Sequence, residues 1–170
     1  MNQADLIAAL GLEPLPVEGG LFRQTWRGVS DATGKPCGTA ITAMLTDDDD
    51  SFSALHRLSS DEVWHFQLGD PMQLLLLWPD LTVTEPIVGP DVLGGHLLTL
   101  VVPAGVWMGA SLVAGGRFCV FACTMAPGFS SDDYEGGQLD ELASRYRRAA
   151  VRIGQLVRPG EPNQRMPEGL

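Results

Sequence analysis

Basic residues are scarce in this 170-residue chain. It carries 11 lysines and arginines against 21 aspartates and glutamates, which gives a formal net charge of −10 at pH 7. A protein that binds mainly DNA or RNA needs a positive surface for the phosphates, and an anionic membrane attracts basic segments for the same reason. The charge therefore predicts neither a nucleic-acid partner nor a membrane partner.

Long apolar runs are missing as well. The run 72–78 (MQLLLLW) is far shorter than the roughly 20 residues that a membrane span requires. The segment MNQADLIAAL at the N-terminus has neither a basic region nor a long apolar region, so we expect no signal peptide. Three cysteines, Cys37, Cys119 and Cys123, fit no closed disulfide framework. We expect a cytoplasmic protein.

Turn-forming residues and short apolar runs are abundant. The chain contains 20 glycines and 12 prolines, which favour many short strands over a few long helices. Strand-like runs separated by turn signals cover 21–27, 39–46, 52–58, 62–68, 72–78, 81–88, 96–102, 106–113 and 117–126. This spacing predicts a mainly β fold, either a sandwich or a barrel.

One helix is expected near each end of the chain. Asn2 and Gly11 are suitable caps for a short helix over 3–10. A second helix over 138–157 has one apolar stripe, formed by Leu139, Leu142, Tyr146, Ala149, Ala150, Ile153 and Leu156. Its arginines form either a solvated face or a basic docking surface, and we favour the solvated face. We expect a single domain over 1–158 and a flexible tail over 159–170.

The densest group of ionisable residues lies within 53–70 (SALHRLSSDEVWHFQLGD). It contains His56, Arg57, Asp61, Glu62 and His65, and an apolar strand follows at once. Desolvation raises the pKa of a carboxyl group and lowers that of a histidine, which moves both toward neutral pH. The group is either a catalytic or binding site or a set of satisfied polar residues at a strand end.

The spacing His56-x-Leu58-x3-Glu62-x6-Gly69 resembles the first motif of the cupin superfamily, and 103–108 (PAGVWM) resembles part of the second. Further pieces are similar to the cupin-5 group of domains of unknown function: 18–23 (EGGLFR), 55–57 with 61–66, 69–71 (GDP), 102–107 and 126–129 (APGF). The resemblance implies a double-stranded β-helix, or jelly roll, that forms a homodimer. This fold agrees with the strand pattern.

Metal-binding cupins take four ligands from the two motifs, and the resemblance places these at His56, Leu58, Glu62 and Met108. Leucine cannot ligate a metal, and a thioether suits soft metals. We therefore expect no metal; a divalent ion, if present, would use His56 and Glu62. His65 is also a catalytic candidate, although strand alternation places it on the opposite face from Glu62.

The expected site is the interior of the barrel. Its catalytic candidates are Glu62, His56 and His65, with Glu62 as base and His56 as acid. Its ligand-binding candidates are Arg23 as an anion anchor, together with Phe22, Trp64, Trp107 and Met108. The tryptophans are alternatively core residues, and Arg23 is alternatively a structural partner of Glu18 or Asp61.

We expect a metal-independent protein that holds a small polar molecule, sugar-like or carboxylate-like, and acts as an isomerase or epimerase. Cupin relatives that epimerise nucleotide-linked sugars use a histidine and an acidic partner, and the resemblance to them is one of fold. The alternatives are a non-catalytic binding or sensor protein with the same pocket and a metal-dependent oxygenase-type cupin.

Overall fold

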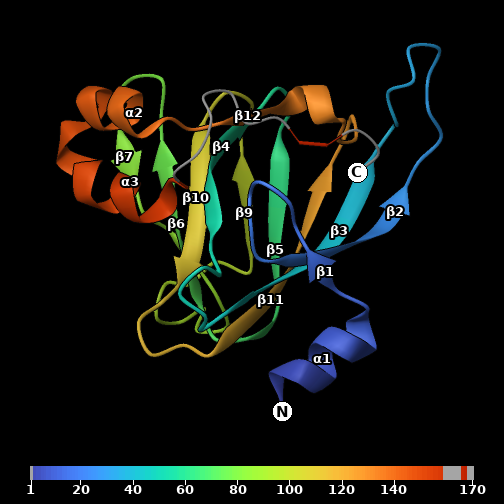
Figure 1. Ribbon diagram of the computed structural model, residues 1–170, viewed down its shortest axis with the longest axis horizontal. Coiled ribbons are helices and arrows are strands. Elements are labelled where there is room, and N and C mark those ends of the chain that lie inside the picture. The colour runs from blue at the N-terminus through green and yellow to red at the C-terminus, as the bar shows by residue number, and fades with distance from the viewer. Residues whose placement is uncertain (1, 159–165, 168–170) are drawn as a thin grey trace.

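Two antiparallel β-sheets packed face to face form the body of the fold in the computed structural model, which describes residues 2–158 and 166–167 (Figure 1). The first sheet has the order β1-β2-β3-β11-β5-β9, with bounds Glu13–Pro14, Leu21–Arg27, Thr39–Thr46, Phe118–Met125, Glu62–Gly69 and Thr99–Val102. The second has the order β12-β4-β10-β6-β7, with bounds Tyr134–Gly136, Ser53–Leu58, Trp107–Leu112, Met72–Leu77 and Val83–Thr84; β8 (Ile87–Val88) also pairs with β6. The predicted mainly β, two-sheet jelly roll is confirmed.

The strand predictions agree closely where apolar and turn residues alternate clearly. Strands β2 and β3 have the predicted bounds, and β4, β5, β6, β10 and β11 differ from theirs by one residue at one or both ends. The single strand predicted over 81–88 is wrong: Leu81 has a left-handed backbone in a turn, and the short strands β7 and β8 flank Glu85 and Pro86. Proline has no N–H for a sheet ladder, which explains the interruption.

The N-terminal helix α1 (Gln3–Leu10) has the predicted caps. The Asn2 Oδ1 accepts a hydrogen bond from the Ala4 backbone N–H at 3.2 Å, and Gly11 ends the helix in the left-handed conformation. Leu6, Ile7 and Leu10 pack on the outer face of the first sheet, beside buried Leu12 and Met44. This helix therefore covers the sheet from outside.

The predicted single helix over 138–157 is wrong. The chain forms α2 (Leu139–Arg145), a 3-10 turn η2 (Arg147–Ala149) and α3 (Ala150–Leu156). Tyr146 lies between them with a non-helical backbone, and its hydroxyl donates a hydrogen bond to the Trp78 carbonyl at 2.9 Å. Tertiary contact at Tyr146 thus overrides the helical pattern. Leu139, expected in the apolar stripe, is 44% exposed.

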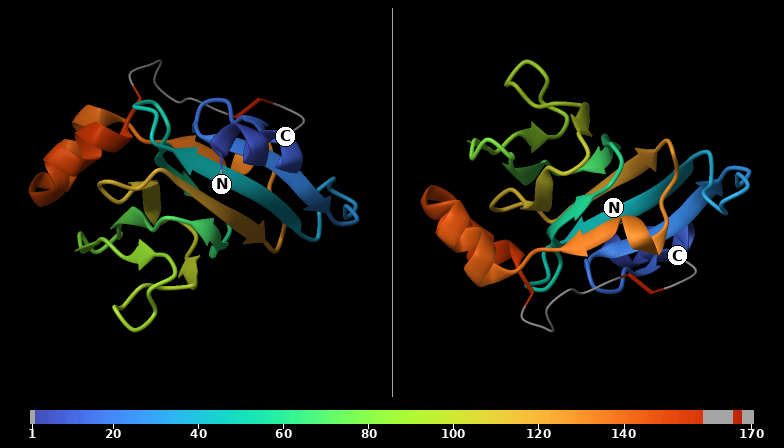
Figure 2. Two further views of the ribbon diagram at one scale, coloured as in Figure 1. Left: turned by 90° about the horizontal axis from the view of Figure 1, so that it is seen from below. Right: turned by 90° about the horizontal axis from the view of Figure 1, so that it is seen from above.

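The two C-terminal helices explain why β6 is continuously apolar over 74–77. Leu74 and Leu76 face the first sheet, whereas Leu75 and Leu77 pack beneath α2 and α3, against Leu142. Figure 2 shows these helices beside the second sheet, on the far side of the molecule from α1. Where the strand is covered on both faces it has no position for a polar residue, so 74–77 show no alternation.

Most of the predicted flexible tail, 159–165 and 168–170, lies outside the described residues. Met166 is described, and its side chain is 5% exposed in the core between the sheets. The flexible tail over 159–170 stays a prediction. No helix among the described residues is long and apolar enough to cross a membrane.

Candidate functional site

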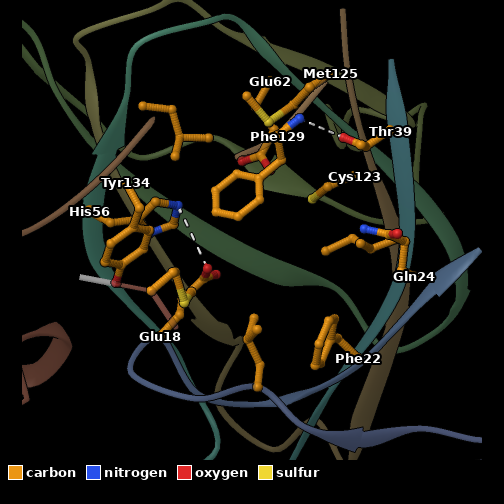
Figure 3. Close-up of a pocket in the computed structure, with 14 residues that line it drawn as sticks. Glu18, Phe22, Gln24, Thr39, His56, Glu62, Cys123, Met125, Phe129 and Tyr134 are labelled. Atoms are coloured by element: carbon orange, nitrogen blue, oxygen red, sulfur yellow. Dashed lines mark hydrogen bonds and ion pairs between the residues drawn. The ribbon is translucent and has the colours of Figure 1, made fainter. Parts of the chain in front are cut away.

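A cavity opens between the two sheets, with about 60 Å³ of space for water-sized molecules (Figure 3). Its wall combines apolar and aromatic side chains with a few ionisable groups. The lining residues are Leu15, Glu18, Phe22, Gln24, Thr39, Ile41, His56, Leu58, Glu62, Cys123, Met125, Phe129, Tyr134 and Met166. A concave, mostly apolar pocket with a few converging polar groups is the usual form of a small-molecule site.

His56 enters the cavity from β4 in the second sheet. Its side chain is 2% exposed, and its ring stacks on Tyr134 with centroids 5.1 Å apart. The Nδ1 atom lies 2.8 Å from the Ala54 carbonyl oxygen. A carbonyl only accepts, so Nδ1 carries a proton and neutral His56 presents the Nε2 lone pair as an acceptor. The backbone therefore fixes both the tautomer and the direction of this base.

Glu62 enters from β5 in the first sheet, opposite His56. The residue is 7% exposed, and its Oε2 has no hydrogen-bond partner among the described residues. Burial raises the pKa of Glu62 to about 7; the charge of His56 opposes this shift, and that of Glu18 adds to it. Glu62 can therefore hold or release a proton near neutral pH.

Glu18 is a third ionisable residue in the cavity, and the sequence reasoning did not assign it to the site. Its Oε1 accepts a hydrogen bond from the buried Ser53 hydroxyl at 2.7 Å, and its Oε2 lies 3.9 Å from His56 Nε2. The latter distance exceeds that of a hydrogen bond, and it allows an ion pair only when His56 also carries a proton on Nε2. The signal was present in 18–20 (EGG), since two glycines beside a carboxylate indicate a special turn.

The backbone around Glu18 is held in an unusual conformation. Val17, Gly19 and Gly20 all have positive φ angles, of 66°, 95° and 72°. Positive φ is costly for a β-branched residue, so surrounding contacts must hold this turn in place. Arg158 supplies them from outside: its Nε donates to the Glu18 carbonyl at 3.2 Å and its Nη2 to the Asp50 carbonyl at 2.6 Å.

The predicted site residues divide into two groups. His56, Glu62 and Phe22 line the cavity, whereas Trp64 and Met108 are buried in the core between the sheets without lining it. Trp64 instead stacks on Phe121 at 5.0 Å. The interpretation of Trp64 as a core residue therefore fits its position better than that of a ligand wall.

Trp107, Arg23 and His65 lie outside the cavity. Trp107 packs in the core beneath the C-terminal helices, because its neighbour Met108 takes the inward position of β10. Arg23 is exposed, and its Nη1 donates to the Leu10 carbonyl at 3.3 Å at the end of α1. His65 is on the outer face of β5, where Nε2 lies 3.0 Å from Thr124 Oγ1. Strand alternation had predicted this position for His65.

Several lining residues could not be found from local patterns. Phe129, Tyr134 and Met166 reach the cavity from segments distant in sequence from His56, and Gln24 and Thr39 come from β2 and β3. The Phe129 backbone N–H donates to Thr39 Oγ1 at 2.9 Å, which fixes one rim of the cavity (Figure 3).

The described residues do not fit a metal. They contain no group of three or more His, Cys, Asp and Glu side chains placed to hold an ion. Leu58 lines the cavity between His56 and Glu62 in sequence, and it has no donor atom. The described part of the cavity thus offers a metal ion too few ligands, while its carboxyl and imidazole groups suit hydrogen bonding and proton transfer.

Known proteins are similar to this chain in sequence and in fold. Residues 4–136 match a family described as the cupin superfamily (DUF985). Comparison with curated proteins gave no significant match.

Two solved structures resemble nearly the whole chain. A structural-genomics protein from Shewanella oneidensis is 28% identical with a TM-score of 0.85, and the match covers 94% of this chain and 99% of that one. A hypothetical protein from Leishmania major is 30% identical with a TM-score of 0.82, over 92% of this chain and 99% of that one.

Oxalate decarboxylase from Bacillus subtilis, described with Mn(II) centres, is a more distant neighbour. It is 13% identical with a TM-score of 0.54, and the match covers 93% of this chain and 41% of that one. At this identity the likeness shows a shared fold only.

Proposed function

The chain belongs to the DUF985 family of the cupin superfamily, and we propose that it binds a small polar organic molecule between its sheets and moves protons on it without a metal. The reaction class that this arrangement favours is isomerisation or epimerisation. A homodimer and a cytoplasmic location stay predictions.

One observation carries the proposal: the Glu62 carboxyl group is buried in the cavity, and its Oε2 has no hydrogen-bond partner among the described residues. A buried polar oxygen without a partner is costly to the fold. A ligand that donates a hydrogen bond to this oxygen removes the cost when it binds. Unsatisfied polar groups of this kind occur at binding and catalytic sites.

The two proton-carrying groups approach a ligand from opposite sheets. Glu62 lies on β5 of the first sheet and His56 on β4 of the second. One group removes a proton from one face of a carbon centre, and the other returns a proton to the opposite face, which inverts the centre. With a pKa of about 7, Glu62 populates both the acid and base forms at neutral pH. With Nδ1–H fixed, neutral His56 takes a proton at Nε2, and the imidazolium form gives that proton back.

Glu62→Gln tests this proposal. The variant keeps the size of the side chain and removes the exchangeable carboxyl proton. In a metabolite screen read by thermal shift and by NMR of the products, we expect hits for the parent protein whose turnover Glu62→Gln abolishes. His65→Gln is the matched control, because His65 lies on the same strand but outside the cavity.

Equal ligand response in the parent and Glu62→Gln would refute the role of Glu62. Thermal shifts without turnover would indicate a binding or sensor protein. Elemental analysis of the purified protein addresses the remaining alternative, since stoichiometric iron, manganese or nickel would favour a metal-dependent cupin.

A further inference from the structure

We infer that the ligand of this cavity carries a small primary ammonium group, and that it is neither a carboxylate nor a phosphate. The inference rests on the proposed function, because it takes the cavity between the sheets as the binding site. It adds the charge and the donor pattern of the molecule that the cavity accepts.

The charges around the cavity favour a cation. Among the described lining residues there is no lysine or arginine, whereas Glu18 and Glu62 both present carboxyl groups. Arg23 lies on the outer face, and the Arg158 guanidinium donates to the carbonyls of Glu18, Asp50 and Phe52. An anionic ligand would meet two carboxylates without a compensating cation from this wall.

The acceptors of the cavity match the donors of a primary ammonium. Glu18 Oε2, His56 Nε2 and Glu62 Oε2 are three acceptor atoms around one space, shown in Figure 3 by the side chains that carry them. Glu18 Oε2 and His56 Nε2 are 3.9 Å apart, too far for a direct hydrogen bond but close enough to share one donor group. An –NH₃⁺ group has three N–H donors and no acceptor, so it suits a cavity wall that presents acceptors of this kind.

Aromatic rings in the cavity also favour a cationic ligand. Phe22 and Phe129 line the same cavity. The face of an aromatic ring attracts a cation, and the attraction is stronger in a site sheltered from water. A carboxylate or phosphate gains nothing from these faces. The aromatic groups and the carboxyl groups therefore select for the same charge.

The enclosed space of the cavity accommodates a group of a few heavy atoms. About 60 Å³ of space for water-sized molecules corresponds to roughly four to six waters. Ethanolamine, ethylene glycol and glycolate are matched probes of this size. They differ mainly in carrying an ammonium, a neutral hydroxyl or a carboxylate.

The experiment measures the affinity of the full-length protein for each probe by calorimetry, with EDTA present. At about pH 8 we expect ethanolamine to bind, ethylene glycol to bind more weakly and glycolate not to bind. In Glu62→Gln, the ethanolamine affinity should fall by at least about tenfold, because a charge-assisted hydrogen bond is lost. His65→Gln should bind ethanolamine as the parent does.

The pH dependence of the ethanolamine affinity is a second measurement. The ionisable groups that line the cavity around Glu62 are Glu18, His56, Cys123 and Tyr134. A cation requires ionised Glu62, so ethanolamine should bind about tenfold more weakly at about pH 6 than at about pH 8. Glu62→Gln should lose this pH dependence.

Glycolate binding as tight as that of ethanolamine would overturn the inference while leaving the proposed function intact. Ethanolamine affinity that is unchanged in Glu62→Gln, or no ethanolamine binding at all, would also overturn it. Failure of the proposed function is separate, since it would appear as metabolite hits that respond equally in the parent and Glu62→Gln.

Discussion

Replacing Glu62 by glutamine should make the fold more stable at neutral and higher pH, although it damages the proposed site. Glu62 has its pKa raised from 4.5 to about 7 in the folded protein, first of all by burial. Below about pH 4.5, Glu62 is uncharged in both the folded and the unfolded protein, so it does not make the stability depend on pH. Stability is then lost progressively as the pH rises toward about 7, because the folded protein must either keep the proton or bury the charge.

The size of this effect follows from the shift. Each pKa unit corresponds to about 1.4 kcal/mol, so the full shift is worth about 3 kcal/mol at high pH. Between about pH 5 and about pH 8, the stability of Glu62→Gln relative to the parent should increase by about 2–3 kcal/mol. The comparison at two pH values cancels contributions that do not depend on pH, such as the packing of the amide.

Urea unfolding at both pH values measures the difference. Glu13→Gln is the control, because Glu13 is exposed on β1 and its carboxylate keeps contact with water. This control should differ little from the parent at either pH. A relative stability of Glu62→Gln that is the same at about pH 5 and about pH 8 would refute the reasoning that Glu62 is buried and desolvated.

Two further predictions concern the framework of the site. Gly19→Ala should lower the free energy of unfolding by about 1–3 kcal/mol and weaken ligand binding, because an added Cβ would overlap the Arg158 guanidinium. The control is Gly34→Ala, which is also at positive φ but has nothing within 4 Å of an added Cβ, and it should leave binding unchanged. Equal binding losses in the two variants would contradict a positioning role for this turn. Ile153→Ala should cost about 2–5 kcal/mol in urea unfolding, since Ile153 is fully buried beneath the second sheet, whereas exposed Val151→Ala should change stability by less than about 0.5 kcal/mol. A small effect at Ile153 would mean that α3 is not packed on the sheet.

Strand alternation in the sequence predicted which side chains of the candidate site point inward. On β5, Glu62 and Trp64 point inward and His65 outward, as the period of two requires. Alternation cannot say how deep in the sandwich an inward side chain lies. Glu62 consequently reaches the cavity, whereas Trp64 two residues later is enclosed in the core.

The sequence by itself determined most of the strands, the caps of α1 and the inward position of Glu62, because these depend on neighbours within a few residues. Only the tertiary structure decided that Glu18 and Met166 join His56 in one cavity, and that Arg23 and Trp107 stay outside it. The local pattern of a residue does not record which distant segment will pack against it. Here a strained turn and a side chain near the C-terminus complete a cavity whose first residues the motif had indicated.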